Sequence, residues 1–227
     1  MILYQPANGY CYNSDTLFLY DFITAFNIKG EVLEIGGGCG VLGLLIKRDF
    51  PKIELTIIEK QKIMSEFIKK NSTLNNLSVS LINDDFLNFG FEKKFDFVIS
   101  NPPFYQGSLK SENEIIKTAR YEEFLPMKKF FVKVNKILKE RGEFIFCYDA
   151  KRIDDIISNM PKPLKIIDIR FMYPRINKNA TLVMLRAKRH AKSTVKIHPP
   201  LIAFEGENYS GEAAKIYKKT STKSVKI

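Results

Sequence analysis

The alternation of two kinds of segment along residues 14–187 constrains the fold of this chain more than any other feature. Short apolar, β-branched runs, typical of buried strands, alternate with amphipathic segments that have helical spacing. This alternation favours parallel strands joined by crossover helices, so we predict an α/β fold with a doubly wound, mostly parallel seven-stranded sheet. The predicted strands are Glu31–Ile35, Glu54–Ile58, Val79–Ile82, Phe95–Ser100, Glu143–Tyr148, Lys165–Tyr173 and Ala180–Ala187. The predicted helices are Ser14–Phe26, capped by Ser14 or Asp15, Val41–Phe50, Gln61–Leu74, Glu122–Leu138 and Ile153–Asn159.

The last two predicted strands form a different kind of pair. Only the turn-forming Pro174–Asn179 separates them, which is too short for a crossover and predicts an antiparallel hairpin at the sheet edge. From Lys188 onward the apolar periodicity is lost. We therefore predict a catalytic domain over residues 1–187, including the N-terminal helix, and a basic tail over residues 188–227. The tail is either part of the same domain or an RNA-binding extension, with order near Leu201–Phe204 and Glu212–Tyr217.

The positive charge lies at one end of the chain. The formal net charge is +11, yet residues 1–150 hold 19 Lys and Arg against 19 Asp and Glu. Residues 151–227 hold 17 against 6. Lys and Arg contacts to phosphates supply most sequence-independent affinity for nucleic acids, so this distribution suits a polyanion-binding surface. General solubility is the alternative interpretation.

Composition excludes several classes of protein. The chain is 45% hydrophobic and 27% charged, as expected of a folded soluble protein. No apolar run approaches the roughly 18 residues that would span a bilayer, and residues 1–12 lack a signal peptide, so we expect a cytoplasmic protein without a membrane partner. The three cysteines form no CxxC pair, which predicts free thiols and no metal. Both histidines lie beyond residue 187, which argues against a nucleophilic triad. A monomer is favoured.

A glycine-rich turn follows the first predicted strand. Residues 36–40 (GGGCG) link that strand to a helix, where glycines let the backbone approach a ligand closely. With Glu34, the glycines Gly36, Gly38 and Gly40 spell the acidic-x-Gly-x-Gly-x-Gly pattern of class I methyltransferases. From Gly38 the same stretch also spells the dinucleotide fingerprint, so a nicotinamide-dependent oxidoreductase stays a weaker alternative.

Carboxylates follow the next two predicted strands. Glu59 ends the second strand close to 20 residues after the glycines, where a carboxylate can accept both ribose hydroxyls of an adenosine cofactor. Asp84, Asp85 and Phe86 follow the third strand, with a turn cap as the structural alternative.

The tetrapeptide Asn101, Pro102, Pro103 and Phe104 directly follows the fourth predicted strand. In open α/β sheets, ligands bind outside the carboxyl ends of the strands. Two prolines fix the backbone, so the carbonyls form a rigid acceptor array. The Asn101 side-chain oxygen and the Pro102 carbonyl could each accept an N–H of a planar amino group and so free its lone pair. Phe104 could stack on the target ring, at roughly 1–3 kcal/mol per base.

These residues resemble the bacterial tRNA(Val) adenine-N6 methyltransferase family. The resemblance rests on Gln5-Pro6 with Gly9-Tyr10 and Asp15, the glycine turn, residues 101–104, Ala119-Arg120 and Tyr173-Pro174-Arg175. It implies a Rossmann-like class I methyltransferase with S-adenosylmethionine as cofactor, and methyl transfer to N6 of an adenine next to a tRNA anticodon. It also implies Asp85 rather than Asp84 against the cofactor adenine, beside Phe86. The sequence departs from the family at Glu34, where Asp is more usual, and at Tyr121.

The tetrapeptide does not identify the substrate, because rRNA, DNA-adenine and protein-glutamine methyltransferases contain the same motif. The basic C-terminal third favours RNA, most of all tRNA. For substrate contact we predict Arg120, at the end of an irregular stretch after Phe104, and Tyr10, whose alternative role is packing under the sheet. An RNA chaperone without catalysis is disfavoured by the intact acceptor motif.

Overall fold

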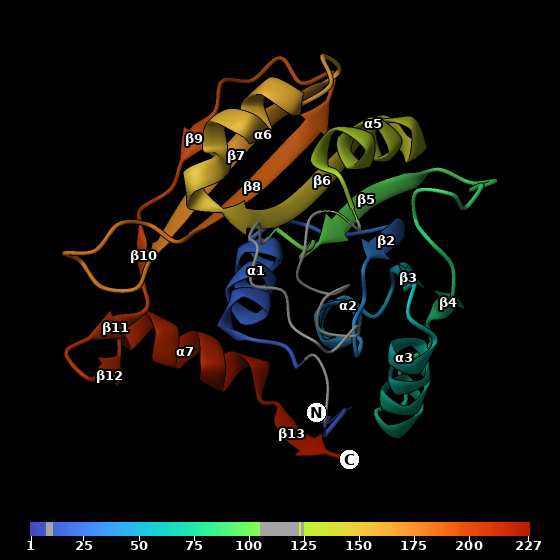
Figure 1. Cartoon of the computed structure of the whole chain (residues 1–227), viewed down its shortest axis with the longest axis horizontal. Helices are drawn as coiled ribbons and strands as arrows, with labels where there is room; N and C mark the ends of the chain where they lie inside the picture. The colour runs from blue at the N-terminus through green and yellow to red at the C-terminus, as the bar shows by residue number, and fades with distance from the viewer. Residues whose placement is uncertain (8–10, 105–122, 124) are drawn as a thin grey trace.

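A nine-stranded sheet forms the centre of the part of the chain that the computed structural model describes, residues 1–7, 11–104, 123 and 125–227 (Figure 1). Its strands are β2 (Glu31–Ile35), β3 (Glu54–Ile58), β4 (Ser80–Ile82), β5 (Phe95–Ser100), β6 (Leu138–Asp149), β7 (Leu164–Tyr173), β8 (Leu182–Arg189), β9 (Lys196–Ile197) and β10 (Leu201–Ile202). Their order is β10-β7-β8-β6-β5-β2-β3-β4, with β9 also paired to β7. Strands β4, β3, β2, β5 and β6 are parallel, whereas β8 is antiparallel to both β6 and β7. The predicted doubly wound fold and its antiparallel hairpin are confirmed. The sheet has nine strands and not the predicted seven, because the two-residue strands β9 and β10 of the predicted tail also pair with β7.

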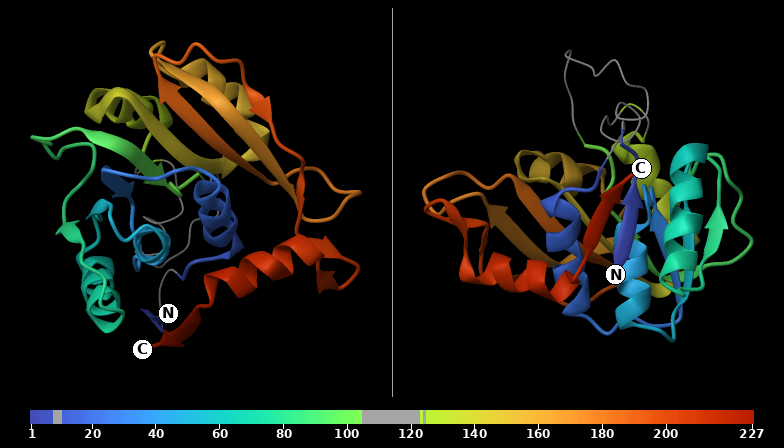
Figure 2. Two further views of the ribbon diagram at one scale, coloured as in Figure 1. Left: turned by 180° about the vertical axis from the view of Figure 1, so that it is seen from behind. Right: turned by 90° about the horizontal axis from the view of Figure 1, so that it is seen from below.

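Helices cover both faces of the sheet (Figures 1 and 2). One face carries α1 (Ser14–Thr24), α2 (Val41–Asp49), α3 (Lys62–Leu74) and α7 (Gly211–Thr220), and the other carries α5 (Met127–Ile137) and α6 (Ile153–Asn159). Side chains alternate between the faces along β6, as the period of a strand requires. Ile145 and Cys147 belong to the apolar cluster on the α1 side, whereas Phe144, Phe146 and Tyr148 belong to the cluster on the α5 side.

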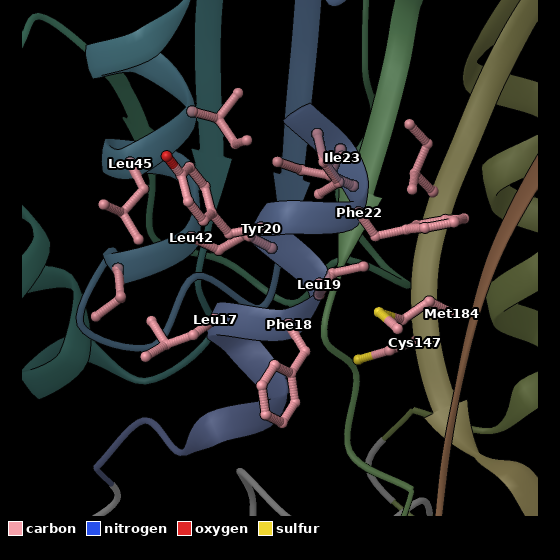
Figure 3. Packing of buried hydrophobic residues seen from close by; sticks show 14 of the residues in the cluster. Leu17, Phe18, Leu19, Tyr20, Phe22, Ile23, Leu42, Leu45, Cys147 and Met184 are labelled. Atoms are coloured by element: carbon pink, nitrogen blue, oxygen red, sulfur yellow. The ribbon is translucent and has the colours of Figure 1, made fainter. Parts of the chain in front are cut away.

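Helix α1 is buried on almost every side, which explains why its sequence is apolar nearly all round. Tyr20 and Leu17 point towards α2, where Leu42 and Leu45 lie, and Phe22 points towards the sheet (Figure 3). The hydroxyl of Tyr20 donates to the carboxylate of Asp49 at the end of α2. Helix α1 therefore forms a central layer between the sheet and the helices outside it.

Several predicted element boundaries differ from the structure, among them the start of β6, which is predicted at Glu143. The cap of α1 is Asn13, whose side-chain oxygen accepts from the amide of Asp15 at 3.2 Å, and not Ser14 or Asp15 themselves. Helix α5 begins at Met127 because Pro126 occupies its N-cap, and its predicted end, Leu138, is the first residue of β6.

The two ends of the chain, predicted as a loop-like opening and a basic tail, lie side by side (Figures 1 and 2). Strand β1 (Ile2–Gln5) pairs in parallel with β13 (Lys223–Lys226), and β11 (Phe204–Glu205) pairs with β12 (Asn208–Tyr209). Helix α7 buries Ala213 and Ile216 in the same apolar cluster as α1. Residues 196–227 thus pack on the core that residues 14–187 build; a boundary at residue 187 stays a prediction.

A buried charge network holds the hairpin to the segment that follows it. Arg186 donates to Glu143 at 2.8 Å and to Asp168 at 3.1 Å, and Lys188 also donates to Glu143 at 2.8 Å. Nε2 of His198 lies 2.7 Å from Asp168. Although burial opposes it, the hydrogen bonds from Arg186 and Lys188 hold the pKa of Glu143 below its ordinary value. The network joins β6, β7 and β8 to the residue after β9.

Candidate functional site

Four chemically distinct segments meet at one edge of the sheet. Because β4, β3, β2 and β5 are adjacent and parallel, their carboxyl ends lie at the same edge. The segments that follow them line a pocket of about 920 Å³, counted with the open space at its mouth. The lining residues are Tyr12, Thr16, Glu34–Leu42 except Gly40, Ile58–Gln61, Met64, Asp84–Phe86, Asn101, Pro103 and Leu125.

The glycine turn forms the floor of this pocket. Gly36, Gly38 and Gly40 have φ angles of 71°, 54° and 86°, which lie in the left-handed region that favours glycine. Gly40 is the N-cap of α2. A Cβ at Gly37 would lie 2.3 Å from Cγ2 of Ile57, so the turn sits directly on β3. Gly36 and Gly38 line the pocket, whereas Gly40 serves the turn into the helix; cofactor binding by the three glycines stays a prediction.

Glu34 is buried under the turn, with 2% of its surface exposed. Its Oε2 accepts from the amide of Gly43 at 3.1 Å. A Cβ at Gly43 would lie 2.2 Å from the same oxygen, so this glycine makes room for the carboxylate. Burial raises the pKa of Glu34 to about 8, and the negative charge of Glu59 adds to the effect. Glu34 therefore reaches the pocket as a group that is poised to exchange a proton near neutral pH.

Glu59, at the end of β3, connects two turns through its carboxylate. Oε2 accepts from the amide of Gly38 at 2.9 Å, and Oε1 accepts from the amide of Gln61 at 2.8 Å. Burial raises its pKa despite these bonds. The carboxylate also accepts a backbone hydrogen bond from Lys60, so three of its roughly four acceptor positions are occupied and one remains for a ligand. The position agrees with the predicted ribose-binding role, which stays a prediction.

Asp84, Asp85 and Phe86 all line the pocket. The carboxylate of Asp85 accepts from Lys60 at 2.9 Å and from the amide of Leu87 at 2.8 Å, so the structural alternative of a turn cap is realised. Phe86 is buried. Contact of Asp85 with an adenine stays a prediction, because both aspartates reach the pocket.

The tetrapeptide after β5 divides between the pocket and the core. Asn101 and Pro103 line the pocket, whereas the side chain of Pro102 is buried. Phe104 is half-buried, and its ring lies 5.4 Å from that of Tyr148. Asn101 donates from Nδ2 to Oγ1 of Thr16 and accepts at Oδ1 from Cys147.

Tyr10 and Arg120, predicted to contact the substrate, lie outside the described residues. The structure adds Tyr12, Thr16 and Leu125 to the pocket. Thr16 lies in the first turn of α1, next to Asp15, and the motif residues themselves do not include it. No group of three or more His, Cys, Asp or Glu side chains among the described residues could hold a metal ion. None of the described helices is long and apolar enough to span a membrane.

Comparison with known proteins assigns the chain to a family. Residues 13–152 match the family model of the methyltransferase small domain, and the chain belongs to this family. The resemblance drawn from the sequence motifs is thereby confirmed at the family level. Membership also favours methyl transfer over the nicotinamide-dependent alternative.

Two curated relatives share part of the sequence. The tRNA1(Val) (adenine(37)-N6)-methyltransferase of Porphyromonas gingivalis is 28% identical over 139 residues, which cover 58% of this chain and 54% of the relative. The ribosomal RNA small subunit methyltransferase C of Actinobacillus pleuropneumoniae is 35% identical over 91 residues, which cover 40% of this chain and 27% of that protein. The matches thus span about half or less of the relatives' length.

A solved structure supports the fold. A predicted O-methyltransferase from Agrobacterium tumefaciens has a TM-score of 0.72 to this chain, with 94% of this chain and all of that chain covered, at 16% identity. At that identity the likeness concerns the fold alone, which is that of class I methyltransferases.

Proposed function

We propose that this chain transfers a methyl group from S-adenosylmethionine to the exocyclic N6 of an adenine in RNA, with tRNA(Val) next to the anticodon as the favoured substrate. The observation that carries the proposal is the position of Asn101. Its side chain lies at the end of β5, in the wall of the pocket that the glycine turn and Glu59 build. This position would set an amide acceptor beside the site proposed for the methyl donor.

The pocket suits S-adenosylmethionine, the cofactor of the family. The turn at Gly37 and Gly38 admits close backbone approach, and Glu59 lies at the end of β3, where a carboxylate would accept from the ribose hydroxyls. Asp85 and Phe86 would contact the adenine ring, and Glu34 would support the amino-acid end through the turn. When bound, this cofactor supplies an activated methyl group on its sulfonium.

The residues of this chain then have to position the target nitrogen. The lone pair of an aromatic amine is delocalised into its ring, so acceptors on its two N–H groups favour a tetrahedral nitrogen that can attack. Oδ1 of Asn101 and the carbonyl of Pro102 would accept those hydrogens, and Pro103 keeps the backbone rigid. No strong base is required, since positioning and oriented dipoles are effective on a methyl group that is already activated.

The choice of RNA rests on charge and on the relatives. The net charge of +11 and the basic C-terminal third suit a polyanion. Both curated relatives are named for RNA substrates. A tRNA loop exposes its bases, and flipping one out of its stack costs a few kcal/mol, which stacking on Phe104 would offset in part. Arg120 and Tyr10 are the further proposed substrate contacts.

The variant Asn101→Ala tests the mechanism. Because it removes an acceptor that acts on the reacting nitrogen, we expect methyl transfer to fall by about 10²-fold, as when one stabilising hydrogen bond of a transition state is removed. The Kd for S-adenosylmethionine, measured by calorimetry, should change less than about twofold, since Glu59 and the glycine turn remain.

The matched control is Asn177→Ala in the exposed turn between β7 and β8, which should leave both quantities unchanged. Full methyl transfer by Asn101→Ala would rule out the proposed role of this side chain.

A further inference from the structure

Two side chains from distant elements hold the amide of Asn101. Its Nδ2 donates to Oγ1 of Thr16 in α1 at 3.0 Å. Its Oδ1 accepts from Sγ of Cys147 in β6 at 3.1 Å. Thr16 is 5% exposed and Cys147 is fully buried, whereas Asn101 itself is half-buried in the pocket wall. The amide is therefore clamped from both ends.

The fold brings Cys147 to this position for a simple reason. Strands β5 and β6 are parallel neighbours, and Ser100, next to Asn101, is paired with Phe146. One residue further along β6, the side chain of Cys147 points to the opposite face, towards α1 (Figure 3). On its other side Cys147 is paired with Met184 of β8. The thiol thus reaches the end of β5 from within the sheet.

The two partners differ in what they reveal about the orientation of the amide. An asparagine amide keeps almost the same shape when its oxygen and nitrogen exchange places. A hydroxyl can donate or accept, so Thr16 is compatible with both orientations. A thiol is a weak donor and a weak acceptor, and because Sγ of Cys147 donates here, Cys147 favours the orientation with Oδ1 towards it. Burial raises the pKa of Cys147 well above its ordinary value, so the thiol keeps its proton.

The orientation matters for the reaction. An amide oxygen has two lone pairs, and Cys147 occupies one of them, which leaves one for the amine of the substrate. With the amide reversed, the NH₂ group of Asn101 would face the N–H groups of the substrate, and no hydrogen bond could form. A single wrong rotamer would therefore abolish the acceptor.

We propose that Cys147 is a positioning residue that selects the Asn101 orientation in which Oδ1 accepts the hydrogen of the target amine. This inference rests on the proposed function, because it assumes that Asn101 acts as that acceptor. Cys147 itself contacts neither substrate nor cofactor.

The test compares Cys147→Ala, Cys147→Ser and the control Ile145→Val. Ile145 lies two residues earlier on the same face of β6 and is also fully buried, so Ile145→Val loses similar packing without touching Asn101. We expect Cys147→Ala to lower kcat about tenfold at unchanged KM for S-adenosylmethionine, which corresponds to one hydrogen bond. Cys147→Ser restores a donor and should recover kcat to within about threefold of the natural protein. Ile145→Val should lower Tm as much as Cys147→Ala does, with kcat unchanged.

A second measurement does not need the substrate. The side-chain amide resonances of Asn101, assigned by their loss in Asn101→Asp, should shift and exchange faster with solvent in Cys147→Ala than in Ile145→Val. The proposal would be overturned if Cys147→Ala and Ile145→Val had equal kcat, or if Cys147→Ser were as slow as Cys147→Ala. Unaltered amide resonances of Asn101 in Cys147→Ala would also overturn it. Failure of the proposed function itself would be seen separately, as full activity of Asn101→Ala.

Discussion

Glu34 shows how a single residue of the site combines packing and chemistry. The sequence predicts it only as the acidic residue of a glycine turn. In the structure it is buried, and Gly43 both donates to its carboxylate and leaves the space that the carboxylate fills. The glycine that completes the dinucleotide-like fingerprint is thus needed here for contact with Glu34. Burial raises the pKa of this carboxyl to about 8, so it is largely protonated at neutral pH in the absence of a ligand.

A pH-dependent stability follows from that shift. Between the ordinary value of 4.5 and about 8, the folded protein holds the Glu34 proton and the unfolded chain does not. The stabilising effect of Glu34 is therefore fully present below pH 4.5 and is lost as the pH rises towards 8. We expect the free energy of unfolding of the natural protein, relative to Glu34→Gln, to fall by about 3–5 kcal/mol from pH 5 to pH 8 in denaturant titrations.

Glu143→Gln is the control for this prediction. The hydrogen bonds from Arg186 and Lys188 lower the pKa of Glu143 in the folded protein. Glu143 is therefore ionised in both the folded and the unfolded protein from pH 5 to pH 8. The difference in the free energy of unfolding between Glu143→Gln and the natural protein should therefore stay constant from pH 5 to pH 8. If the difference in the free energy of unfolding between Glu34→Gln and the natural protein were also constant over this range, Glu34 would be ionised in the folded protein.

The sequence reveals site residues that directly follow strands and misses those that come from elsewhere. Glu59 and Asn101 could be predicted because strand ends of a parallel sheet converge. Thr16 and Cys147 contact Asn101 from sequence separations of 85 and 46 residues. Nothing in their local sequence differs from an ordinary helix start or a buried strand residue. Only the packing of α1 and β6 around the end of β5 brings them together.

At the scale of elements, strand β13 supports the pocket although it lies at the end of the chain. It pairs with β1, and the hydroxyl of Tyr12, a residue of the pocket, lies 3.2 Å from Oγ1 of Thr222 and 3.0 Å from Oγ of Ser224. The amide of Tyr12 donates to Oε1 of Gln5 in β1 at 3.0 Å. From α3, Asn71 donates to the carbonyls of Tyr4 and Cys39 and so ties β1 to the glycine turn. The two chain ends together hold one wall of the pocket.

Deletion of residues 222–227 tests this arrangement. It removes β13 and both hydroxyl partners of Tyr12, so the wall of the pocket should become less ordered. We expect the Kd for S-adenosylmethionine to rise about three- to tenfold in calorimetric titrations, which corresponds to one or two lost hydrogen bonds.

The double variant Lys223→Ala and Lys226→Ala provides the matched control, because both side chains are exposed and the strand remains. It should bind the cofactor normally. An unchanged Kd in the deletion would mean that Tyr12 is held without the C-terminal strand.

Element prediction succeeds where local patterning is strong. Strands β2, β3 and β5 are predicted because they are apolar and almost entirely buried. Strands β1 and β13 have four residues each, and β13 is largely exposed, so neither shows a clear alternation. Their pairing joins residues more than 200 positions apart and depends on the rest of the fold.

At the scale of the whole molecule, the basic C-terminal third is part of the structure as well as a source of charge. Arg186 and Lys188 pair with Glu143, Arg170 pairs with Glu212, and Lys219 pairs with Asp21. These cations stabilise the molecule and contribute less to a surface for RNA than their number suggests. Exposed lysines remain along the same third of the chain, among them residues 165, 178, 192, 196, 215 and 218. Long-range attraction of a polyanion therefore stays a prediction from the sequence. The dependence of the RNA-binding Kd on salt concentration would measure it.

The central claim is methyl transfer to N6 of an adenine in RNA. Its most direct test is incubation of the purified protein with radiolabelled S-adenosylmethionine and unmodified tRNA, followed by nucleoside analysis. We predict label in N6-methyladenosine, formed at a rate about 10²-fold lower with Asn101→Ala. Label in a different nucleoside, or none in tRNA although the cofactor binds, would contradict the account and direct the search to rRNA, DNA or a protein glutamine.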